Sequence, residues 1–221
     1  MTELFKALKI EKNEEHQEIN LVEISEDDLM EGNVVVDVTH STLNYKDGLA
    51  MTGSSQIVRN FPMIPGIDFS GVVRSSEDSE FSKGDRVVLN GYGLSEIHYG
   101  GYSERARVNS KHLLKLPENI SNHQAMQIGT AGYTAMLCVL GLEDFGITPK
   151  SGEILVTGAS GGVGSVAISI LSDLGFSVIA STGRLSETDY LKSLGADTVI
   201  DRNELSEPSR PLGKERWLGA V

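Results

Sequence analysis

The chain has 221 residues, of which 39% are hydrophobic and 23% charged, a composition that can bury a core and form one or two globular domains. Its 31 acidic residues outnumber its 19 basic residues, and the formal charge of −12 argues against broad contact with nucleic acid or with anionic lipid. The chain starts without the basic and apolar segments of a signal peptide, and no apolar run approaches the roughly 20 residues of a membrane-spanning helix, so we predict a cytoplasmic protein.

Short apolar or alternating runs, separated by glycines, fill the chain as far as Pro117. The runs that predict β-strands are residues 33–39, 71–74, 85–89 and 105–108. Many short strands with glycine-rich connections are typical of a small β-barrel or sandwich. We therefore expect a β-rich first half.

A long helix is predicted between the two halves of the chain. Ser121 and Gln124 have the spacing of a capping box, in which two side chains satisfy free backbone groups at a helix start, and a helical pattern follows to about Leu142. The single cysteine, Cys138, lies in an apolar stretch of this helix and cannot form an internal disulfide. We expect it to be a packed thiol.

From residue 153 onward, strand and helix patterns alternate. Strands are predicted at residues 154–157, 177–180 and 198–200, and helices at residues 163–174 and 187–194. This alternation predicts a parallel sheet covered by helices. Residues 217–221 have the pattern of a fourth strand at its start, whereas a complete dinucleotide-binding sheet has about six strands. We expect the open sheet edge to favour instability or self-association.

A glycine-rich loop, Gly158-Ala-Ser-Gly-Gly-Val-Gly164, follows the first of these strands and precedes a helix. Glycines at such a position let the backbone approach a pyrophosphate, whose charge is met by free amides and by the helix dipole. The loop lacks the Gly-Lys-Ser/Thr of a P-loop. The predicted cofactor contacts in the loop are Gly158, Ser160, Gly161, Gly162, Val163 and Gly164.

The same loop also fits the pattern of short-chain dehydrogenases. Those enzymes place the loop at the start of the chain and need a Tyr and a Lys four residues apart well downstream. Here the only later tyrosine, Tyr190, is followed by Ser193 and Leu194. The position of the loop after a β-rich half favours a medium-chain architecture.

The end of the second strand indicates which dinucleotide is bound. NAD-specific sites usually carry Asp or Glu there to hold the ribose 2′-hydroxyl, but this chain reads Ala180-Ser-Thr-Gly-Arg184. Hydroxyls and a guanidinium can bind a phosphate instead, which favours NADPH. The candidate contacts at this sheet edge are Ser181, Thr182, Gly183, Arg184 and, after the third strand, Arg202. The alternative is that both arginines only face solvent.

Seven stretches resemble the medium-chain dehydrogenase/reductase superfamily, and within it the quinone-oxidoreductase-like branch that holds NADPH-dependent acrylyl-CoA (acryloyl-CoA) reductases. They are residues 43–48, 65–71, 83–87, 129–135, 158–164, 180–184 and 211–217, of which the last two are specific to the branch. The resemblance implies an α/β fold class. A GroES-like β-barrel would occupy residues 1–121, and an interdomain helix with the first part of a Rossmann doubly wound parallel sheet would occupy residues 122–221, with the cofactor in the cleft between them.

The resemblance to the zinc alcohol dehydrogenases of the same superfamily stops at the metal ligands. Their Gly-His-Glu stretch corresponds to Gly66-Ile67-Asp68, their early ligand cysteine falls near Asn44, and no cluster of four cysteines is present. The histidines are scattered without ligand spacing at His16, His40, His98, His112 and His123. We therefore expect no metal.

Without a Lewis acid such as zinc, reduction of a ketone is difficult, whereas hydride addition to an activated carbon-carbon double bond requires less polarisation of the substrate. The resemblance thus implies hydride transfer from NADPH to a small α,β-unsaturated carbonyl compound, with acryloyl-CoA as substrate and propanoyl-CoA as product. Tyr45 is the first candidate for a nicotinamide contact and proton donor, Asn44 and Asp47 are further catalytic candidates, and Thr130 and Thr134 are candidate nicotinamide contacts. The alternative is that Tyr45 packs the ring, the other two fix a turn and the threonines pack a helix.

Two other functions stay open. An NADPH:quinone oxidoreductase would use the same cofactor site, and a non-catalytic nucleotide-binding or structural protein would share the fold. We expect a small-molecule substrate, no nucleic-acid or membrane partner, and a homodimer for a full-length chain. Because family members continue beyond this point, we expect a truncated form that needs the missing part for activity.

Overall fold

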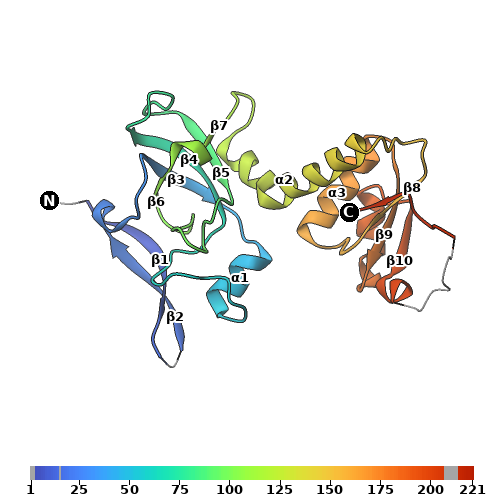
Figure 1. Cartoon of the computed structure of the whole chain (residues 1–221), viewed down its shortest axis with the longest axis horizontal. Helices are drawn as coiled ribbons and strands as arrows, with labels where there is room; N and C mark the ends of the chain where they lie inside the picture. Colours follow the sequence, from blue (N-terminus) through green and yellow to red (C-terminus); the bar gives the residue numbers. More distant parts are fainter. Residues whose placement is uncertain (1–2, 15, 207–213) are drawn as a thin grey trace. The chain divides into compact units, whose positions relative to one another are not determined.

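The computed structural model describes residues 3–14, 16–206 and 214–221, so part of the 211–217 motif lies outside the described residues. The chain divides into two compact units, Met1–Thr130 and Ala131–Val221 (Figure 1). Their boundary falls inside a long helix. The sequence predicts domains at residues 1–121 and 122–221, and these domain boundaries stay a prediction.

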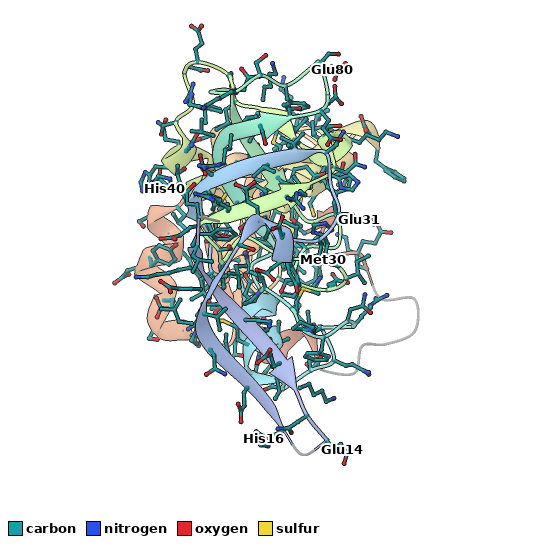
Figure 2. All side chains as sticks on the ribbon, turned by 90° about the vertical axis from the view of Figure 1, so that its left-hand side faces the viewer. Glu14, His16, Met30, Glu31, His40 and Glu80 are labelled. Atoms are coloured by element: carbon teal, nitrogen blue, oxygen red, sulfur yellow. The ribbon has the colours of Figure 1, made fainter. Side chains whose placement is uncertain are left out.

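The described residues of the first unit form two antiparallel sheets. Strands β1 (Phe5–Lys12) and β2 (Gln17–Ile24) form a hairpin, whose tip near Glu14 and His16 extends away from the larger sheet (Figure 2). The larger sheet has the order β6-β3-β4-β5-β7. Its strands are β3 (Val34–Ser41), β4 (Asp68–Ser76), β5 (Arg86–Asn90), β6 (Arg105–Val108) and β7 (Leu114–Lys115).

All four strands predicted in this half lie in the larger sheet, because their valine-rich runs bury side chains in one core. Val36 of β3, Phe69 of β4 and Val87 of β5 are completely buried there. Apolar burial of this kind is the main favourable contribution to folding. The sequence does not predict the hairpin, because Phe5 and Ile10 are buried among charged and half-exposed neighbours that weaken the apolar pattern.

Helix α2 (Asn122–Asp144) begins with the predicted capping box. The backbone N–H of Gln124 donates to Ser121 Oγ at 3.1 Å, and the N–H of Ser121 donates to Gln124 Oε1 at 2.9 Å. Gly129 interrupts the helix with φ 51° and ψ −165°, a conformation that favours glycine. The helix therefore consists of two segments that meet at Gly129.

Among the described residues, α2 is the one helix that is long and apolar enough to cross a membrane. This differs from the expectation that no apolar run approaches that length. The reason is that no charged side chain occurs between Asn122 and Leu142, and one window of the helix reaches a mean hydropathy of 1.4. Such a helix is weak support for a membrane span, since core helices of soluble proteins pass the same test. Cys138, on this helix, is half-buried.

The second unit is a parallel sheet with the order β10-β9-β8-β11. Its elements are β8 (Glu153–Val156), α3 (Gly162–Asp173), β9 (Ser177–Thr182), α4 (Thr188–Ser193), β10 (Thr198–Asp201) and β11 (Gly219–Ala220). The predicted strands and helices of this half are confirmed with small shifts at their ends, and the start of a fourth strand is confirmed as β11, which pairs with β8. The strand order reverses at β8, as in a Rossmann sheet, and ligands of such sheets bind beside this reversal.

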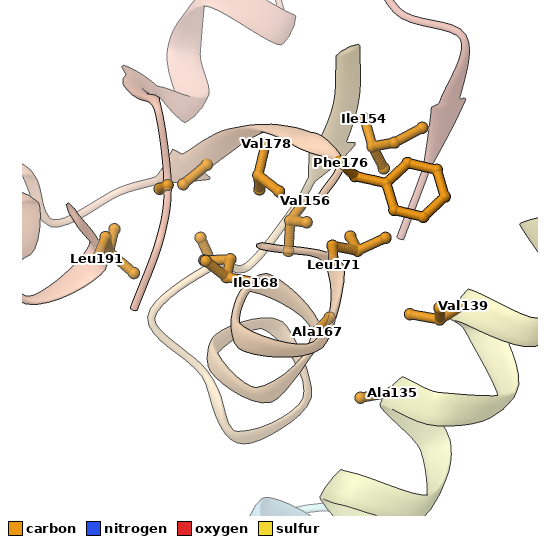
Figure 3. Close-up of a cluster of buried hydrophobic side chains, with 13 residues drawn as sticks. Ala135, Val139, Ile154, Val156, Ala167, Ile168, Leu171, Phe176, Val178 and Leu191 are labelled. Carbon is orange, nitrogen blue, oxygen red and sulfur yellow. The ribbon is translucent and has the colours of Figure 1, made fainter. Parts of the chain in front are cut away.

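Helices pack against the sheet of the second unit through completely buried side chains. Ile168 of α3 lies in one cluster with Val156 and Val178 of the sheet (Figure 3). Ala135 and Val139, from the second segment of α2, belong to the same cluster. This packing fixes the start of α3 at the carboxyl end of β8, where the glycine-rich loop joins them.

Candidate functional site

The glycine-rich loop of the second unit needs glycine at two positions for different reasons. Gly158 has φ 54°, in the left-handed region that other residues rarely adopt. A Cβ atom on Gly164 would lie 2.6 Å from the carbonyl oxygen of Gly158, so the first turn of α3 can approach the loop only without a side chain. Gly161 is the N-cap of α3 and makes no side-chain cap. The amides of the first turn are therefore available to an anion.

A cluster of hydroxyl and guanidinium groups joins this loop to the end of β9. Ser160 Oγ lies 2.8 Å from Thr182 Oγ1, and the backbone N–H of Arg184 donates to Thr182 Oγ1 at 3.1 Å. The Arg184 guanidinium donates to the carbonyl oxygen of Ser160 at 3.4 Å and is exposed to solvent. Loop and strand end thus present their polar groups together, as expected for one ligand site.

Arg202 reaches the same turn from the third strand of the unit. It begins the short 3-10 helix Arg202–Leu205 directly after β10. A Cβ atom on Gly183 would lie 2.8 Å from Arg202 Nε, so the guanidinium lies across this glycine. The sequence spacing places Arg202 at the same edge, and the structure brings it beside the turn that carries Arg184. Two cations and two hydroxyls here suit a doubly charged phosphate.

Ser181 lies differently from its neighbour. Side chains alternate along a strand, so Ser181 and Thr182 point to opposite faces of the sheet. Ser181 is 1% exposed, and its hydroxyl has no hydrogen-bond partner within the described residues. Its predicted contact with a cofactor phosphate stays a prediction, while Thr182 is the hydroxyl that the structure joins to the loop.

The candidate residues of the first unit surround the start of helix α1 (Tyr45–Thr52). Asn44 is the N-cap, and its backbone N–H donates to Asp47 Oδ2 at 2.9 Å in a capping box. Asp47 Oδ1 accepts from the backbone N–H of Ile67 at 3.0 Å. Asp47 is completely buried, whereas Tyr45 is 85% exposed. The turn therefore presents the Tyr45 phenol outward and keeps the Asp47 carboxyl inside.

Burial dominates the chemistry of Asp47. Loss of solvent raises the pKa of its carboxyl above the ordinary value of 3.8, and the nearby Asp68 carboxyl adds to this rise. The N–H donors of Asn44 and Ile67 act in the opposite direction. Tyr102, whose hydroxyl donates to the carbonyl oxygen of Thr42 at 2.8 Å, has its pKa raised by burial and by the Asp47 carboxyl. A catalytic contact of Asp47 with substrate stays a prediction.

Asp68 is a second buried carboxyl that the sequence does not single out for this site. Thr42 donates its hydroxyl to Asp68 Oδ1 at 2.5 Å, and the backbone N–H of Thr130 donates to Asp68 Oδ2 at 2.8 Å. The Asn44 side chain donates to Thr42 Oγ1 at 2.7 Å, so the network reaches a predicted residue. The one available signal is an aspartate at the start of β4, directly before the buried Phe69.

The two threonines predicted to approach the nicotinamide lie on either side of the boundary between the units. Thr130 starts the second segment of α2, and its hydroxyl is buried without a hydrogen-bond partner in the described part of the chain. Thr134 is half-buried one turn later. Their contacts with a cofactor stay predictions.

The histidines are less scattered than their spacing indicates. The rings of His40 and His123 meet edge to face, with centroids 5.4 Å apart. His16 lies at the hairpin tip, well away from His40 (Figure 2). Within residues 3–14, 16–206 and 214–221, no group of three or more His, Cys, Asp or Glu side chains is arranged to hold a metal ion.

Comparison with known proteins connects this geometry to a family. The alcohol dehydrogenase GroES-like domain matches residues 30–118. The probable acrylyl-CoA reductase AcuI of Escherichia coli (strain K12) is 53% identical over 97% of this chain and 66% of its own length. The acrylyl-CoA reductase AcuI of Ruegeria pomeroyi is 49% identical over 99% of this chain and 67% of its own length. The putative quinone oxidoreductase YhfP of Bacillus subtilis (strain 168) is 46% identical over 100% of this chain and 67% of its own length.

Solved structures agree with these relatives. The yhdH oxidoreductase of Salmonella enterica in complex with NADP has a TM-score of 0.94 and 52% identity over 97% of this chain and 66% of that chain. Bacillus subtilis yhfP with NAD bound has a TM-score of 0.94 and 45% identity over 99% of this chain and 67% of that chain. The chain thus spans about two thirds of the length of these proteins.

A GroES-like β domain followed by a Rossmann-type sheet with a glycine-rich loop defines a nucleotide-dependent oxidoreductase. Identity of about half over nearly the whole chain identifies the group within that class. The chain belongs to the medium-chain dehydrogenase/reductase family, in the branch of the acrylyl-CoA reductases.

Proposed function

We propose that the complete gene product is an NADPH-dependent, zinc-independent reductase of small α,β-unsaturated carbonyl compounds, which converts acryloyl-CoA to propanoyl-CoA. The choice of NADPH as cofactor rests on the cluster of polar and cationic side chains beside the glycine-rich loop, which are Ser160, Thr182, Arg184 and Arg202. No carboxylate occurs between residues 180 and 184. Support for the reaction comes from the AcuI relatives.

The residues of the second unit fit the proposed cofactor. The free amides at the start of α3 would bind its pyrophosphate, and the Ser160, Thr182 and Arg184 groups would bind the adenosine 2′-phosphate. Arg202 would cover the adenine side of this phosphate. When bound, NADPH supplies the hydride for the β-carbon of the acceptor.

The residues of the first unit are proposed to act on the acceptor. Negative charge develops on the carbonyl oxygen during the reduction, and a donor placed beside that oxygen lowers the barrier. Tyr45 has an exposed phenol that can donate such a hydrogen bond, and the α1 capping box of Asn44 and Asp47 holds it in place. We propose Tyr45 as the group that contacts the acceptor, with Asn44 beside it.

The remaining assignments follow from composition and relatives. The substrate is a small molecule, as for other oxidoreductases of the family. The formal charge of −12 supports a protein without nucleic-acid or anionic-membrane partners. We also propose that the protein is cytoplasmic and that the complete gene product is a homodimer.

Turnover measurements on the complete gene product test the proposed function. Loss of NADPH absorbance is followed with acryloyl-CoA and with a benzoquinone, each also with NADH as the matched cofactor control. We expect kcat/KM for acryloyl-CoA to exceed that for the quinone by about tenfold or more. A clear preference for the quinone would assign the protein to the quinone oxidoreductases. Tight NADPH binding without turnover of either acceptor would instead indicate a nucleotide-binding protein without this activity.

A further inference from the structure

Asp68 is a completely buried carboxyl without a cationic partner at ion-pair distance in the described part of the chain. Its two oxygens accept hydrogen bonds from the Thr42 hydroxyl at 2.5 Å and from the backbone N–H of Thr130 at 2.8 Å. Asn90 Nδ2 lies at the longer distance of 3.5 Å. Burial of a carboxyl group costs free energy unless its hydrogen bonds are satisfied. The hydrogen bonds from Thr42 and Thr130 therefore stabilise Asp68 in this position.

The Asp68 carboxyl sets the direction of a hydrogen-bond chain. Because both of its oxygens accept, the Thr42 hydroxyl donates its only proton to it, and Thr42 Oγ1 can then only accept from its other neighbour. That neighbour is Asn44 Nδ2, at 2.7 Å. Asp47 Oδ2 accepts from the same amide nitrogen at 3.2 Å. Acceptors therefore surround the NH₂ group of the Asn44 amide and fix its orientation.

This orientation leaves the carbonyl oxygen of the Asn44 side chain as an acceptor. The backbone N–H of Asp47 donates to the backbone carbonyl oxygen of Asn44 at 3.0 Å, so the side-chain carbonyl oxygen keeps a lone pair for another donor. Asn44 is half-buried, and the next residue is the exposed Tyr45. The carbonyl oxygen thus belongs to the same turn as the phenol proposed to contact the acceptor.

We propose that Thr42 and Asp68 are positioning residues, which orient the Asn44 amide so that its carbonyl oxygen accepts a hydrogen bond from an amide N–H of the bound molecules. The inference rests on the proposed function, which places Asn44 beside the reacting groups. Two sources offer this chemistry, the carboxamide of the nicotinamide and the amides of the coenzyme A arm. Neither Thr42 nor Asp68 touches the reacting atoms, since both act through Asn44.

Four variants of the complete gene product test the role of Thr42 and Asp68. Thr42→Val removes the hydroxyl at similar volume, and Thr42→Ser keeps a hydroxyl. In Asp68→Asn one carboxylate oxygen is replaced by an NH₂ group, so the side chain can accept hydrogen bonds at only one of the two positions. Ser41→Ala is the matched control, because Ser41 Oγ donates to the backbone carbonyl of Asp68 at 2.6 Å and lies outside the chain to Asn44. We expect Thr42→Val and Asp68→Asn to lower kcat/KM about tenfold to hundredfold, while Thr42→Ser and Ser41→Ala stay within about threefold of the parent.

A double-mutant cycle separates positioning from general loss of structure. If Thr42 acts through Asn44, Thr42→Val has no further effect on kcat/KM in a protein that already carries Asn44→Ala. A weaker NADPH affinity in Thr42→Val, measured by calorimetry, assigns the bound amide to the cofactor. A raised KM for acryloyl-CoA at unchanged NADPH affinity assigns it to the acyl substrate. Equal losses in Thr42→Val and Ser41→Ala, or losses that multiply with Asn44→Ala, would overturn the inference.

A measurement that needs no turnover keeps this inference distinct from the proposed function. The side-chain amide NMR signals of Asn44 should shift in Thr42→Val and in Asp68→Asn but not in Ser41→Ala. Absence of turnover by the parent protein with either acceptor would refute the proposed function alone. Unchanged Asn44 signals in Asp68→Asn, or in Thr42→Val where it folds, would refute the positioning role whatever the activity.

Discussion

Arg184 and Arg202 reach one turn from two different elements, and their roles can be measured separately. Arg184 follows β9 and contacts the loop at Ser160, while Arg202 follows β10 and lies across Gly183. We expect Arg184→Ala and Arg202→Ala each to weaken NADPH binding about tenfold to hundredfold, because hydrogen bonds to charged groups contribute roughly 1.5 to 3 kcal/mol. NADH lacks the 2′-phosphate, so its affinity should change by less than about twofold.

Calorimetry of the complete gene product with both dinucleotides checks this prediction. Lys192→Ala is the matched control, since Lys192 is an exposed cation of α4 in the same unit. Equal weakening of NADPH and NADH by Arg184→Ala would show that the guanidinium does not recognise the phosphate. A loss in Lys192→Ala as large as in Arg184→Ala would indicate a general charge effect instead.

The grouping of Ser160, Thr182 and Arg184 could be predicted from the sequence, whereas the contact between Thr42 and Asp68 could not; the roles of all these residues stay predictions. Loop glycines, hydroxyls and arginines lie within short stretches of known spacing, so local pattern is sufficient for Ser160, Thr182 and Arg184. Thr42 and Asp68 are 26 positions apart, and only the pairing of strands brings them together. No spacing rule describes such a contact.

Helix α1 provides a prediction about pH, because its capping residue Asp47 is buried. In the folded chain the pKa of Asp47 lies above its ordinary value of 3.8. Between that value and the higher folded pKa, the folded state holds a proton that the unfolded state has lost. The free energy of unfolding contributed by Asp47 is therefore fully present below pH 3.8 and falls as the pH rises through the folded pKa.

Chemical denaturation of the parent and of Asp47→Asn between about pH 3 and pH 7 measures this effect. The variant cannot titrate, so the stability of the parent relative to the variant should decrease with rising pH and then level off. Glu3, Asp28 and Asp85 have lowered pKa values and make stability fall toward acid, but they act equally in both proteins. A difference that stays constant with pH would contradict the raised pKa.

Helices and strands that bury a continuous apolar run are predicted more accurately from the sequence than those that bury only a few side chains. Strands β8 and β9 are buried runs next to helices with a clear period, and their predicted positions are correct within small shifts. The β1 and β2 hairpin carries many charged residues and is recognised only through its pairing and through the few side chains it buries. The break in α2 at Gly129 likewise depends on tertiary contacts, since glycine alone does not stop a helix.

At the scale of the whole molecule, candidate residues occur in both compact units, and a single ligand can test whether the two groups of residues serve one function. Hydrogen exchange of the complete gene product, with and without saturating NADP⁺, reports on both parts at once. We expect exchange to slow by about tenfold or more in the loop and first turn of α3, where the amides are free, and at residues 182–184. Residues 44–47 should also be protected if Tyr45 contacts the nicotinamide, as the sequence predicts.

Strand β2 is the internal control for this measurement, because the β1 and β2 hairpin contains none of the candidate residues. Its exchange should not change with NADP⁺, and NAD⁺ at the same concentration should protect residues 182–184 less, since it carries no 2′-phosphate. If NADP⁺ slows exchange in the loop but not at residues 44–47, the loop binds the cofactor and Tyr45 does not contact it. Protection of residues 44–47 without the loop would contradict the assignment of the glycines, because the pyrophosphate is the group that the free amides of α3 are suited to bind.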